Sequence, residues 1–229
     1  MKITGVIIAR KGSKRVKNKM YKKIFNCSLI ENKIQQLIKS NIDEIIVGSD
    51  DLKLKNICDK YSGSKKVIFV KRDKKYCDEK STTPNEMIKN MLGLFKTDVV
   101  LWAHLTNPFV NELHYNKAIT IYKNFNKKKY DSLFSVTRIF DYFWNTNKKP
   151  LNHNPNEKSH TLLSSGKIKP IFADNGAIFI RPYKLMMKDG RFWGKKGYMY
   201  EMNEKDGWDI NFPWDLEACQ LKSFKNKKF

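Results

Sequence analysis

The chain has 229 residues, with 45 Lys or Arg against 23 Asp or Glu, so its formal net charge is +22. This length suits one α/β domain with a buried core, and a hydrophobic content of 41% excludes a disordered chain. No apolar run approaches the roughly 18 residues that span a bilayer, so no membrane partner is expected.

The positive charge favours anionic partners but does not identify one. Lysines are spread along the whole chain and mixed with asparagines, which is typical of a coding bias on a solvated surface. Only the cluster from Arg10 to Lys23 is dense enough to indicate a specific site. The cysteines are widely spaced and form no CxxC pair, so we expect reduced thiols and a cytoplasmic protein.

The first element is a short apolar strand that ends in a cationic loop, Arg10 to Lys19. A strand, a basic turn with one glycine and then a helix is the order of parts that holds a polyphosphate at the edge of a parallel sheet. The loop has neither the GxxxxGK[ST] pattern nor a three-glycine dinucleotide fingerprint. A plain turn at Gly12 with solvated lysines is therefore the alternative interpretation.

The next elements alternate between helical and strand periodicity. Apolar residues at helical spacing predict helices over Ser28–Lys39 and Leu52–Tyr61, and apolar runs predict strands over Glu44–Val47 and Lys66–Val70. This βαβαβ order predicts a mostly parallel sheet with right-handed crossovers and helices on both faces.

The second half continues this pattern after a polar segment, Lys71 to Pro84. Helices are predicted over Asn85–Phe95 and Leu113–Phe125, and strands over Asp98–Ala103, Ser132–Val136 and Gly176–Ile180. No linker separates two domains, so residues 1–229 are expected to form a single domain. Residues 138–172 lack clear periodicity and are expected to form a lid or a dimerisation arm.

Ligands of open parallel sheets bind outside the carboxyl ends of the strands. The candidate loops there carry cations for phosphate, hydroxyl and amide groups for a base or sugar, and a few carboxylates. Asp209 and Asn211 are two residues apart, so in an extended segment both oxygens point the same way and suit a hard cation such as Mg²⁺. By spacing alone, a surface aspartate followed by a turn-forming asparagine is the favoured alternative.

Five stretches, in order, resemble motifs of the acylneuraminate cytidylyltransferases, the CMP-sialic acid synthetases and their relatives. IIARKGSKRVKNK resembles the LARxxSKGxxxK signature, and IIVGSDD resembles IIVSTD. LTNPF resembles the QPTSPL loop, DNGAIFI resembles NGAIYI, and WDINFPWDLEAC resembles the closing IDIDTxxDL motif. The ordered matches cover nearly the whole chain, which makes them far more specific together than any one alone.

The resemblance implies a Rossmann-like nucleotidyltransferase fold and a homodimer formed through the arm. It also implies a reaction in which CTP and a 2-keto-3-deoxy acid sugar give a CMP-sugar and pyrophosphate, with Mg²⁺ as cofactor. The catalytic residues implied are Arg10, Lys19 and Asp209. For the nucleotide, the resemblance implies Arg10, Gly12, Ser13, Lys14, Lys19, Ser81, Thr82 and His104. For the sugar it implies Asn175, Phe192 and Trp193. For the metal it implies Asp209 and Asn211.

The sequence also departs from the family pattern. The second metal carboxylate is Asn211 here, so we expect weaker metal binding or a role for another acid such as Asp215 or Asp206. His104 replaces a glutamine, and either Lys71 or Arg72 takes the position of a family arginine. The basic tract that grips the sugar carboxylate is missing, with Lys167 and Lys169 as possible substitutes.

Three other readings stay open at this stage. The first is a nucleotidyltransferase with a different acceptor, such as 3-deoxy-manno-octulosonate or a non-sugar. The second is a basic nucleic-acid-binding protein, which would explain the charge but which no RRM, KH or helix-turn-helix signature supports, so no nucleic acid is expected. The third is a catalytically degenerate relative, because Asn211 lacks a charge.

Overall fold

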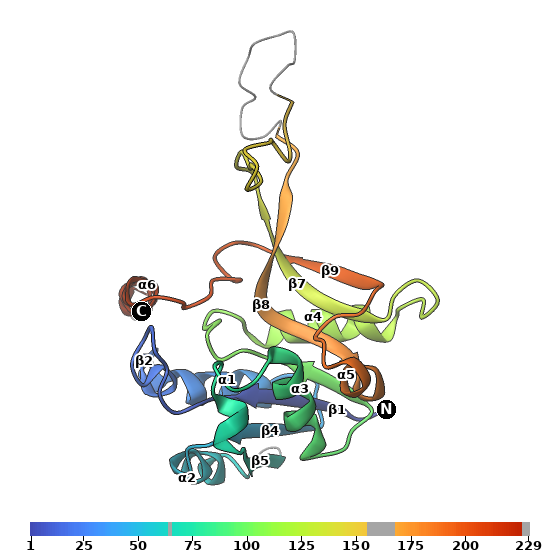
Figure 1. The fold of residues 1–229 in the computed structure, drawn as a ribbon. Helices are drawn as coiled ribbons and strands as arrows, with labels where there is room; N and C mark the ends of the chain where they lie inside the picture. Colours follow the sequence, from blue (N-terminus) through green and yellow to red (C-terminus); the bar gives the residue numbers. More distant parts are fainter. Residues whose placement is uncertain (64–65, 155–167, 226–229) are drawn as a thin grey trace.

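The computed structural model describes residues 1–63, 66–154 and 168–225. Within these residues a seven-stranded sheet has the order β5-β4-β1-β6-β8-β7-β9 (Figure 1). Its strands are β1 (Ile3–Ile8), β4 (Glu44–Ser49), β5 (Lys66–Lys71), β6 (Val99–Trp102), β7 (Ser132–Ile139), β8 (Ile171–Pro182) and β9 (Gly197–Met202). All run in one direction except β8, which is antiparallel to β6 and β7. The mostly parallel sheet is therefore confirmed.

Helices cover both faces of the sheet, as predicted. On one face, side chains of α1 (Leu29–Ile38), α2 (Lys53–Lys60) and α4 (Glu112–Lys123) join a core cluster with Ile7 of β1. On the other face, α3 (Pro84–Gly93) and α5 (Tyr183–Asp189) pack against Val6 of the same strand. This division follows from the alternation of side chains along a strand.

Short elements complete the fold. The 3₁₀ turns η1 (Lys19–Tyr21) and η2 (Lys74–Cys77) follow β1 and β5, and the hairpin of β2 (Lys23–Ile24) and β3 (Cys27–Ser28) precedes α1. The helix α6 (Pro213–Lys225) ends the described chain and adds Leu216 and Cys219 to the core. Gln220 of this helix donates a hydrogen bond to the Lys23 carbonyl at 3.0 Å, which ties α6 to β2.

Several elements differ from the sequence prediction. The short helix α5 and the edge strand β9 were not predicted. In β9 the sequence GYMYEM exposes two of its six residues and lacks a clean alternation. Strand β8 begins at Ile171 rather than Gly176, and its antiparallel direction follows from the long excursion that precedes it. The other predicted elements are confirmed to within a few residues at their ends.

The excursion begins and ends in strands. Strands β7 and β8 extend past the body of the domain, where Arg138 pairs with Phe172 and Ile139 pairs with Ile171 (Figure 1). Beyond them Trp144 bridges to Pro150. A two-stranded ribbon has no sheet face to bury, which is why its sequence lacks a strand periodicity. The described parts of residues 138–172 form this projecting arm, whereas residues 155–167 lie outside the described structure.

No helix in the described part of the chain combines the length and apolar character that a bilayer span requires. The cysteines Cys27, Cys58, Cys77 and Cys219 all lie within the described residues, and none forms a disulfide.

Candidate active site

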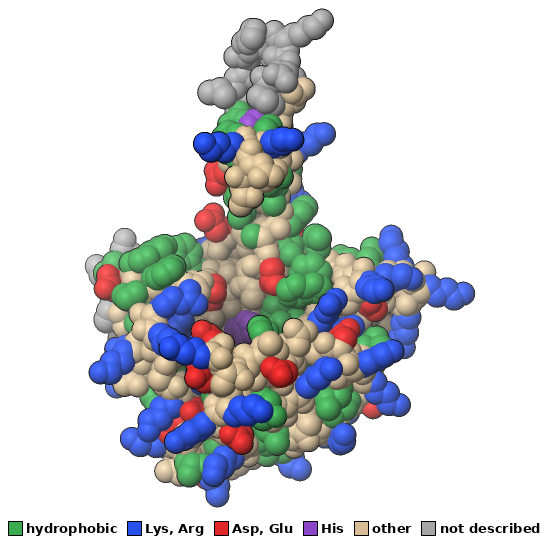
Figure 2. Space-filling view, viewed as in Figure 1, with side chains coloured by type: hydrophobic (Ala, Val, Ile, Leu, Met, Phe, Trp, Pro, Cys, Tyr) green, Lys and Arg blue, Asp and Glu red, His purple; other side chains and the backbone are tan. Residues whose placement is uncertain are grey.

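A cavity of about 770 Å³ opens at the carboxyl ends of the parallel strands β1, β5 and β6. Its walls come from the basic loop after β1, from the segment between β5 and α3, and from the loop after β6. The space-filling view shows a hollow below the arm, with a histidine at its floor and charged side chains of both signs around its rim (Figure 2). The lining residues that carry polar groups include Arg10, Ser13, Lys14, Arg15, Lys19, Arg72, Tyr76, Cys77, Asp78, Glu79, Thr82, Thr83, His104, Thr106 and Asn211.

The basic loop is fixed at its start by neighbouring loops. The Lys11 amide donates to an Asp50 carboxylate oxygen at 2.8 Å, and Gly12 has a φ of +79°, which lets the chain turn sharply. Arg10 donates to the Cys77 carbonyl at 3.0 Å and pairs with the carboxylate of Glu79. The Arg10 guanidinium is therefore held across the cavity, from the β1 loop to the segment before α3.

Lys19, at the end of the basic loop, is held by the segment that carries Asp209. Asn18 adopts a left-handed conformation, after which η1 begins at Lys19. The Lys19 ammonium donates to the Ile210 carbonyl at 2.6 Å. Burial lowers the pKa of Lys19, while the nearby charge of Asp209 raises it. The basic loop and the Asp209 segment therefore face each other.

Arg72, and not Lys71, lines the cavity. Its side chain is only 2% exposed, and its backbone amide donates to the Ser49 carbonyl at 2.8 Å. Lys71 is exposed on the outer edge of the sheet. Gly48 is required beneath Arg72, because a Cβ there would approach the Arg72 Cδ to 2.9 Å and the Met91 sulfur to 2.3 Å. Sequence spacing did not distinguish these two neighbours, whereas burial does.

His104 follows β6 and packs edge-on against Phe179 and Phe192, with ring centroids 5.6 Å apart in each case. Burial lowers the pKa of His104, the charge of Asp209 raises it, and the charge of Lys33 lowers it. The net lowering of the His104 pKa favours the neutral imidazole, which can donate from one ring nitrogen and accept at the other.

Asp209 is held by its neighbour along the chain. The side-chain nitrogen Nδ2 of Asn211 donates to Asp209 Oδ2 at 2.7 Å, while Asp209 Oδ1 is buried without a hydrogen-bond partner. The two alternative acids are engaged elsewhere. Asp215 accepts from the backbone amides of Asn211 and Phe212 at 2.9 and 2.7 Å. Asp206 contacts the side chains of Asn203 and His114. No group of three or more acidic, histidine or cysteine side chains suited to a metal occurs among the described residues.

Asn175 is part of the internal framework of the site. Its Oδ1 accepts from the Ser135 hydroxyl at 2.6 Å and the Ala177 amide at 3.1 Å, and its Nδ2 donates to Thr137 Oγ1 at 3.1 Å. Gly207 packs directly over it, since a Cβ there would lie 2.5 Å from Asn175 Nδ2. Asn175 therefore couples β8 to β7 and does not line the cavity.

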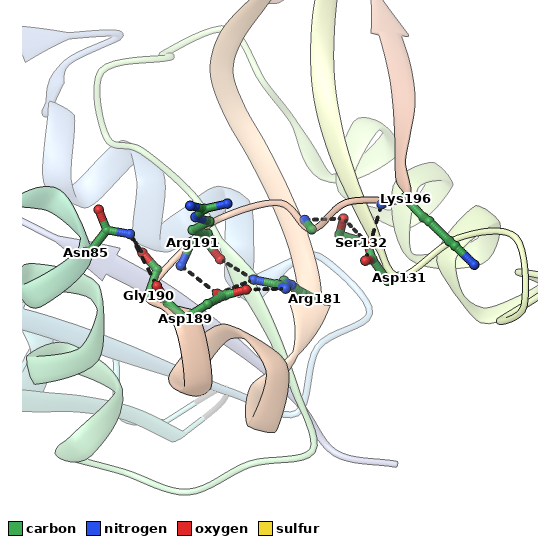
Figure 3. Close-up of polar contacts among 9 residues, drawn as sticks. Asn85, Asp131, Ser132, Arg181, Asp189, Gly190, Arg191 and Lys196 are labelled. Atoms are coloured by element: carbon green, nitrogen blue, oxygen red, sulfur yellow. Dashed lines mark hydrogen bonds and ion pairs between the residues drawn. The ribbon is translucent and has the colours of Figure 1, made fainter.

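Phe192 and Trp193 lie on the loop between Arg191 and Lys196, and Figure 3 shows the contacts that anchor both ends of this loop. At its start, Arg181 donates to both carboxylate oxygens of Asp189, at 2.6 and 2.8 Å, and to the Arg191 carbonyl at 2.9 Å. At its end, the Asp131 carboxylate accepts from the Ser132 hydroxyl and the Lys196 amide.

These anchors place the two rings on the Phe179 side of His104. The Phe192 ring stacks on Phe179 with centroids 4.6 Å apart, and Trp193 leaves 42% of its side chain exposed. Neither ring lines the cavity itself. The aromatic surface therefore adjoins the cavity on the side of β8 and the base of the arm.

The predicted site residues thus divide into two groups. Those that line the cavity are Arg10, Ser13, Lys14, Lys19, Thr82, His104 and Asn211. Those that adjoin it or lie elsewhere are Gly12, Ser81, Asn175, Phe192, Trp193 and Asp209. Ser81 donates to the carbonyls of Lys75 and Asp78, so its hydroxyl stabilises the loop before α3. Lys169 is exposed on the arm, where its carbonyl accepts from the Asn152 side chain at 2.9 Å, and Lys167 lies outside the described residues.

Sequence reasoning missed the segment Tyr76–Glu79 and the residues Thr83 and Pro84, which also line the cavity. Thr83 begins α3 with a capping box, in which its hydroxyl accepts the Glu86 amide at 3.3 Å. The pattern T-P-N-E, a Ser or Thr followed three residues later by Glu, was a usable sequence signal for this helix start.

Comparison with solved structures defines the class of fold. CMP:2-keto-3-deoxy-manno-octonic acid synthetase, solved in complex with CTP, superposes with a TM-score of 0.69 at 14% identity over 99% of this chain and all of the other. The 4-diphosphocytidyl-2C-methyl-D-erythritol synthase from Anaerococcus prevotii superposes with a TM-score of 0.67 at 14% identity, covering 96% of this chain and 97% of the other. The fold is therefore that of the nucleotidyltransferases.

The sequence comparison then identifies the family. A model of the cytidylyltransferase family matches residues 4–227, and the chain belongs to this family. N-acylneuraminate cytidylyltransferase of Escherichia coli O18:K1:H7 is 26% identical over 99% of this chain and 54% of its own length. Pseudaminic acid cytidylyltransferase of Campylobacter jejuni is 24% identical over 96% of both chains. The chain spans about half the length of the first two curated relatives, from Escherichia coli and Danio rerio.

Proposed function

We propose that this chain is a cytidylyltransferase that transfers CMP from CTP to a sialic-acid-like 2-keto-3-deoxy acid sugar, with release of pyrophosphate. The observation that carries the proposal is a cavity in which Arg10 and Lys19 face the Asp209 segment across the ends of the parallel strands. Family membership and the names of the relatives support the same reaction.

The chemistry needs positioning and charge neutralisation more than a covalent catalyst. The anomeric hydroxyl of the sugar attacks the α-phosphorus of CTP, a new O–P bond forms, the bond to the β-phosphate oxygen breaks, and the hydroxyl loses its proton. Arg10 and Lys19 are placed to neutralise the triphosphate and the departing pyrophosphate. Lys14 and the backbone amides near Gly12 and Ser13 extend this cationic wall.

Mg²⁺ is the cofactor that we propose for this reaction. Asp209 fits it, because its Oδ1 is a buried carboxylate oxygen without a hydrogen-bond partner, and such an atom is costly unless a cation or water satisfies it. Mg²⁺ is commonly bound through one or two carboxylates together with water and substrate phosphates, so a small acidic set suffices. When bound, the ion would neutralise phosphate charge.

Recognition of the acceptor is assigned to the side of the cavity near His104 and the anchored aromatic loop. Phe192 and Trp193 present an apolar surface there, next to a neutral imidazole that can hydrogen-bond to a hydroxyl or amide. The relatives' names cover N-acylneuraminate and pseudaminic acid, so a nonulosonic acid is the first acceptor class to test. A structural neighbour named for 3-deoxy-manno-octonic acid makes this sugar the second candidate.

Pyrophosphate release tests the proposal directly. The chain is incubated with each of the four NTPs, Mg²⁺ and a panel of keto-acid sugars that includes N-acetylneuraminate, pseudaminate and 3-deoxy-manno-octulosonate. We expect pyrophosphate release only when CTP is the nucleotide and an acid sugar of one class is also present. Pyrophosphate release with another NTP would overturn the assignment of cytosine as the nucleobase. An absence of turnover combined with tight, salt-sensitive RNA binding would instead support a nucleic-acid-binding protein.

The proposal includes a cytoplasmic homodimer in which the arm contacts a second copy. The arm exposes large apolar side chains on its described surface, among them Phe140, Trp144, Leu151 and Phe172, which are 39 to 58% exposed. Exposed apolar side chains gathered on one projection indicate an interaction surface. Sedimentation at micromolar concentration should give a dimer mass. A monomer mass for the wild-type chain would contradict this part of the proposal.

A further inference from the structure

The acidic side of the site contains a carboxylate that neither the motif spacing nor the relatives' names point to. Asp174 lies on β8 immediately before Asn175, at a break in the β7–β8 ladder. Phe134 pairs with Phe179 and Val136 pairs with Asp174, so residue 135 of β7 lies opposite residues 175–178 of β8. Bulges of this kind redirect side chains and are frequent next to active sites.

The bulge is joined to the Asp209 segment by one buried side chain. Asn107, with no exposed surface, donates from Nδ2 to the carbonyls of Asn175 at 2.8 Å, Gly207 at 3.2 Å and Trp208 at 3.3 Å. The residues that precede Asp209 and follow Asp174 therefore meet at the same amide group. Asp174 itself is exposed, one residue before the Asn175 carbonyl that Asn107 contacts.

Two buried oxygen atoms at this junction have no hydrogen-bond partner. One is Asp209 Oδ1, and the other is Asn107 Oδ1, which lies 4.0 Å from the position that a Cβ would take on Gly176. Buried carboxylate and amide oxygens are rarely left unsatisfied, and both are ligands of hard cations. Their coincidence beside Asp174 points to a cation rather than to packing alone.

Asn211 is unsuited to the role of second carboxylate, because its nitrogen is turned toward Asp209 Oδ2 at 2.7 Å and acts as a donor. Asp215 and Asp206 are engaged by backbone and side-chain donors, as described above. Asp174 keeps a free oxygen in the described structure, since only its Oδ1 is used, accepting from the Gly176 amide at 2.9 Å.

We propose that Asp174 and Asp209 form the carboxylate pair of the divalent-cation site, with Asn107 Oδ1 beside them, and that Asn211 orients Asp209 without supplying charge. This inference rests on the proposed function. The acidic wall is then complete, but its second member comes from β8 instead of the segment that carries Asp209. A carboxylate on β8 would also place the cation between the nucleotide side of the cavity and the aromatic loop.

The test measures binding of Mn²⁺, a probe for Mg²⁺, by electron paramagnetic resonance of the full chain without nucleotide. Asp174→Asn keeps the acceptor for the Gly176 amide and removes only the charge, so the fold is preserved. We expect this variant to raise the Mn²⁺ Kd at least ~10-fold, because affinity depends on the number of charged ligands. Asp78→Asn, on the opposite wall of the cavity, is the matched control and should leave the Kd within about twofold.

A charge-relocation variant sharpens the test. In Asp174→Asn combined with Asn211→Asp, the carboxylate returns to the segment of Asp209, and we expect much of the lost Mn²⁺ affinity to be recovered. Unchanged Mn²⁺ affinity in Asp174→Asn, or no Mn²⁺ binding by the wild-type chain at millimolar concentration, would overturn the inference.

Failure of the proposed function has a different signature. A wild-type chain that binds Mn²⁺ through Asp174 but releases no pyrophosphate from CTP with any acid sugar would retain the cation site and lose the proposed reaction. Conversely, CTP-dependent release together with an Asp174→Asn variant of normal Mn²⁺ affinity would keep the reaction and discard this site.

Discussion

The two walls of the cavity are built in different ways. Most of the cationic side comes from one continuous loop, Arg10 to Lys19, whose charges are close in the sequence, and Arg72 is added from the end of β5. In our proposal the acidic side is assembled from β8 and the Asp209 segment, and Asn107 contacts the backbone of both. A loop that follows one strand can be recognised by reading the chain, whereas a wall made from distant segments becomes visible only when the sheet order is known.

The largest effect is expected from the acidic wall. Asp209→Ala should reduce kcat by about 10²–10³-fold or more, which is the scale found when one preorganised electrostatic contact to the transition state is removed. The fold should survive, because among the described residues the Asp209 side chain makes a single hydrogen bond, with the Asn211 side chain. The measurement is pyrophosphate release with CTP, accompanied by circular dichroism to monitor folding. Wild-type activity in this variant would refute the assignment of Asp209.

The cationic wall should respond almost as strongly. Arg10→Ala removes a guanidinium that spans the cavity to Cys77 and Glu79, so we expect kcat/KM for CTP to fall by about 10²-fold. Arg10→Lys should recover little, since a lysine cannot hold two contacts in the same plane. Equal activity of Arg10→Ala and the wild-type chain would show that the triphosphate lies elsewhere.

A smaller effect is expected when a carboxylate is added at position 211. Asn211→Asp adds a carboxylate beside Asp209 and should lower the Mg²⁺ concentration for half-maximal activity by roughly 3–10-fold. Asn211→Ala, which removes the donor to Asp209 Oδ2 without adding charge, is the matched comparison and should shift this concentration in the opposite direction. A Mg²⁺ requirement unaltered in both variants would separate Asn211 from the metal site.

The smallest effect concerns stability. Lys33 is fully buried, with its ammonium hydrogen-bonded to the Asn107 carbonyl at 2.9 Å and the Tyr115 hydroxyl at 2.8 Å, and burial lowers its pKa to about 7. Above pH 7 the folded chain releases this proton, while the unfolded chain keeps it up to a pKa of about 10.4. The unfolded state then binds more protons, so this group makes the free energy of unfolding rise with pH between those values.

The comparison with Lys33→Met isolates this contribution. Between pH 7 and pH 9 the wild-type chain should gain stability relative to the variant, by up to about 1.4 kcal/mol per pH unit. Urea unfolding at pH 7, 8 and 9 measures the difference. Parallel pH profiles for the two chains would mean that Lys33 stays charged in the folded state.

The sequence predicted much of the fold because its signals are local. Apolar runs and helical spacing located the strands β1, β4, β5, β6 and β7 and four of the helices, and five ordered motifs indicated the family. It did not predict the reversed direction of β8 or the edge strand β9, which depend on pairing between distant segments. The choice between Lys71 and Arg72 likewise required burial, because adjacent residues on a strand point to opposite faces.

The candidate site likewise combines residues that one local motif predicts with residues that only the fold brings together. Arg10, Ser13, Lys14 and Lys19 were predicted from one motif and line the cavity together. Asn175 is predicted to contact the sugar, and this stays a prediction; in the structure its side chain joins β7 and β8. Asp174 was passed over, because its relation to Asp209 arises from a bulge and a buried asparagine that no spacing in the sequence expresses.

A crystal structure of the full chain with CTP and Mn²⁺ tests the central claim most directly. The account predicts a triphosphate against the loop from Arg10 to Lys19, with an anomalous Mn²⁺ peak in contact with Asp209 and Asp174. A triphosphate bound away from that loop, or Mn²⁺ held by other acids such as Asp78 and Glu79, would contradict it.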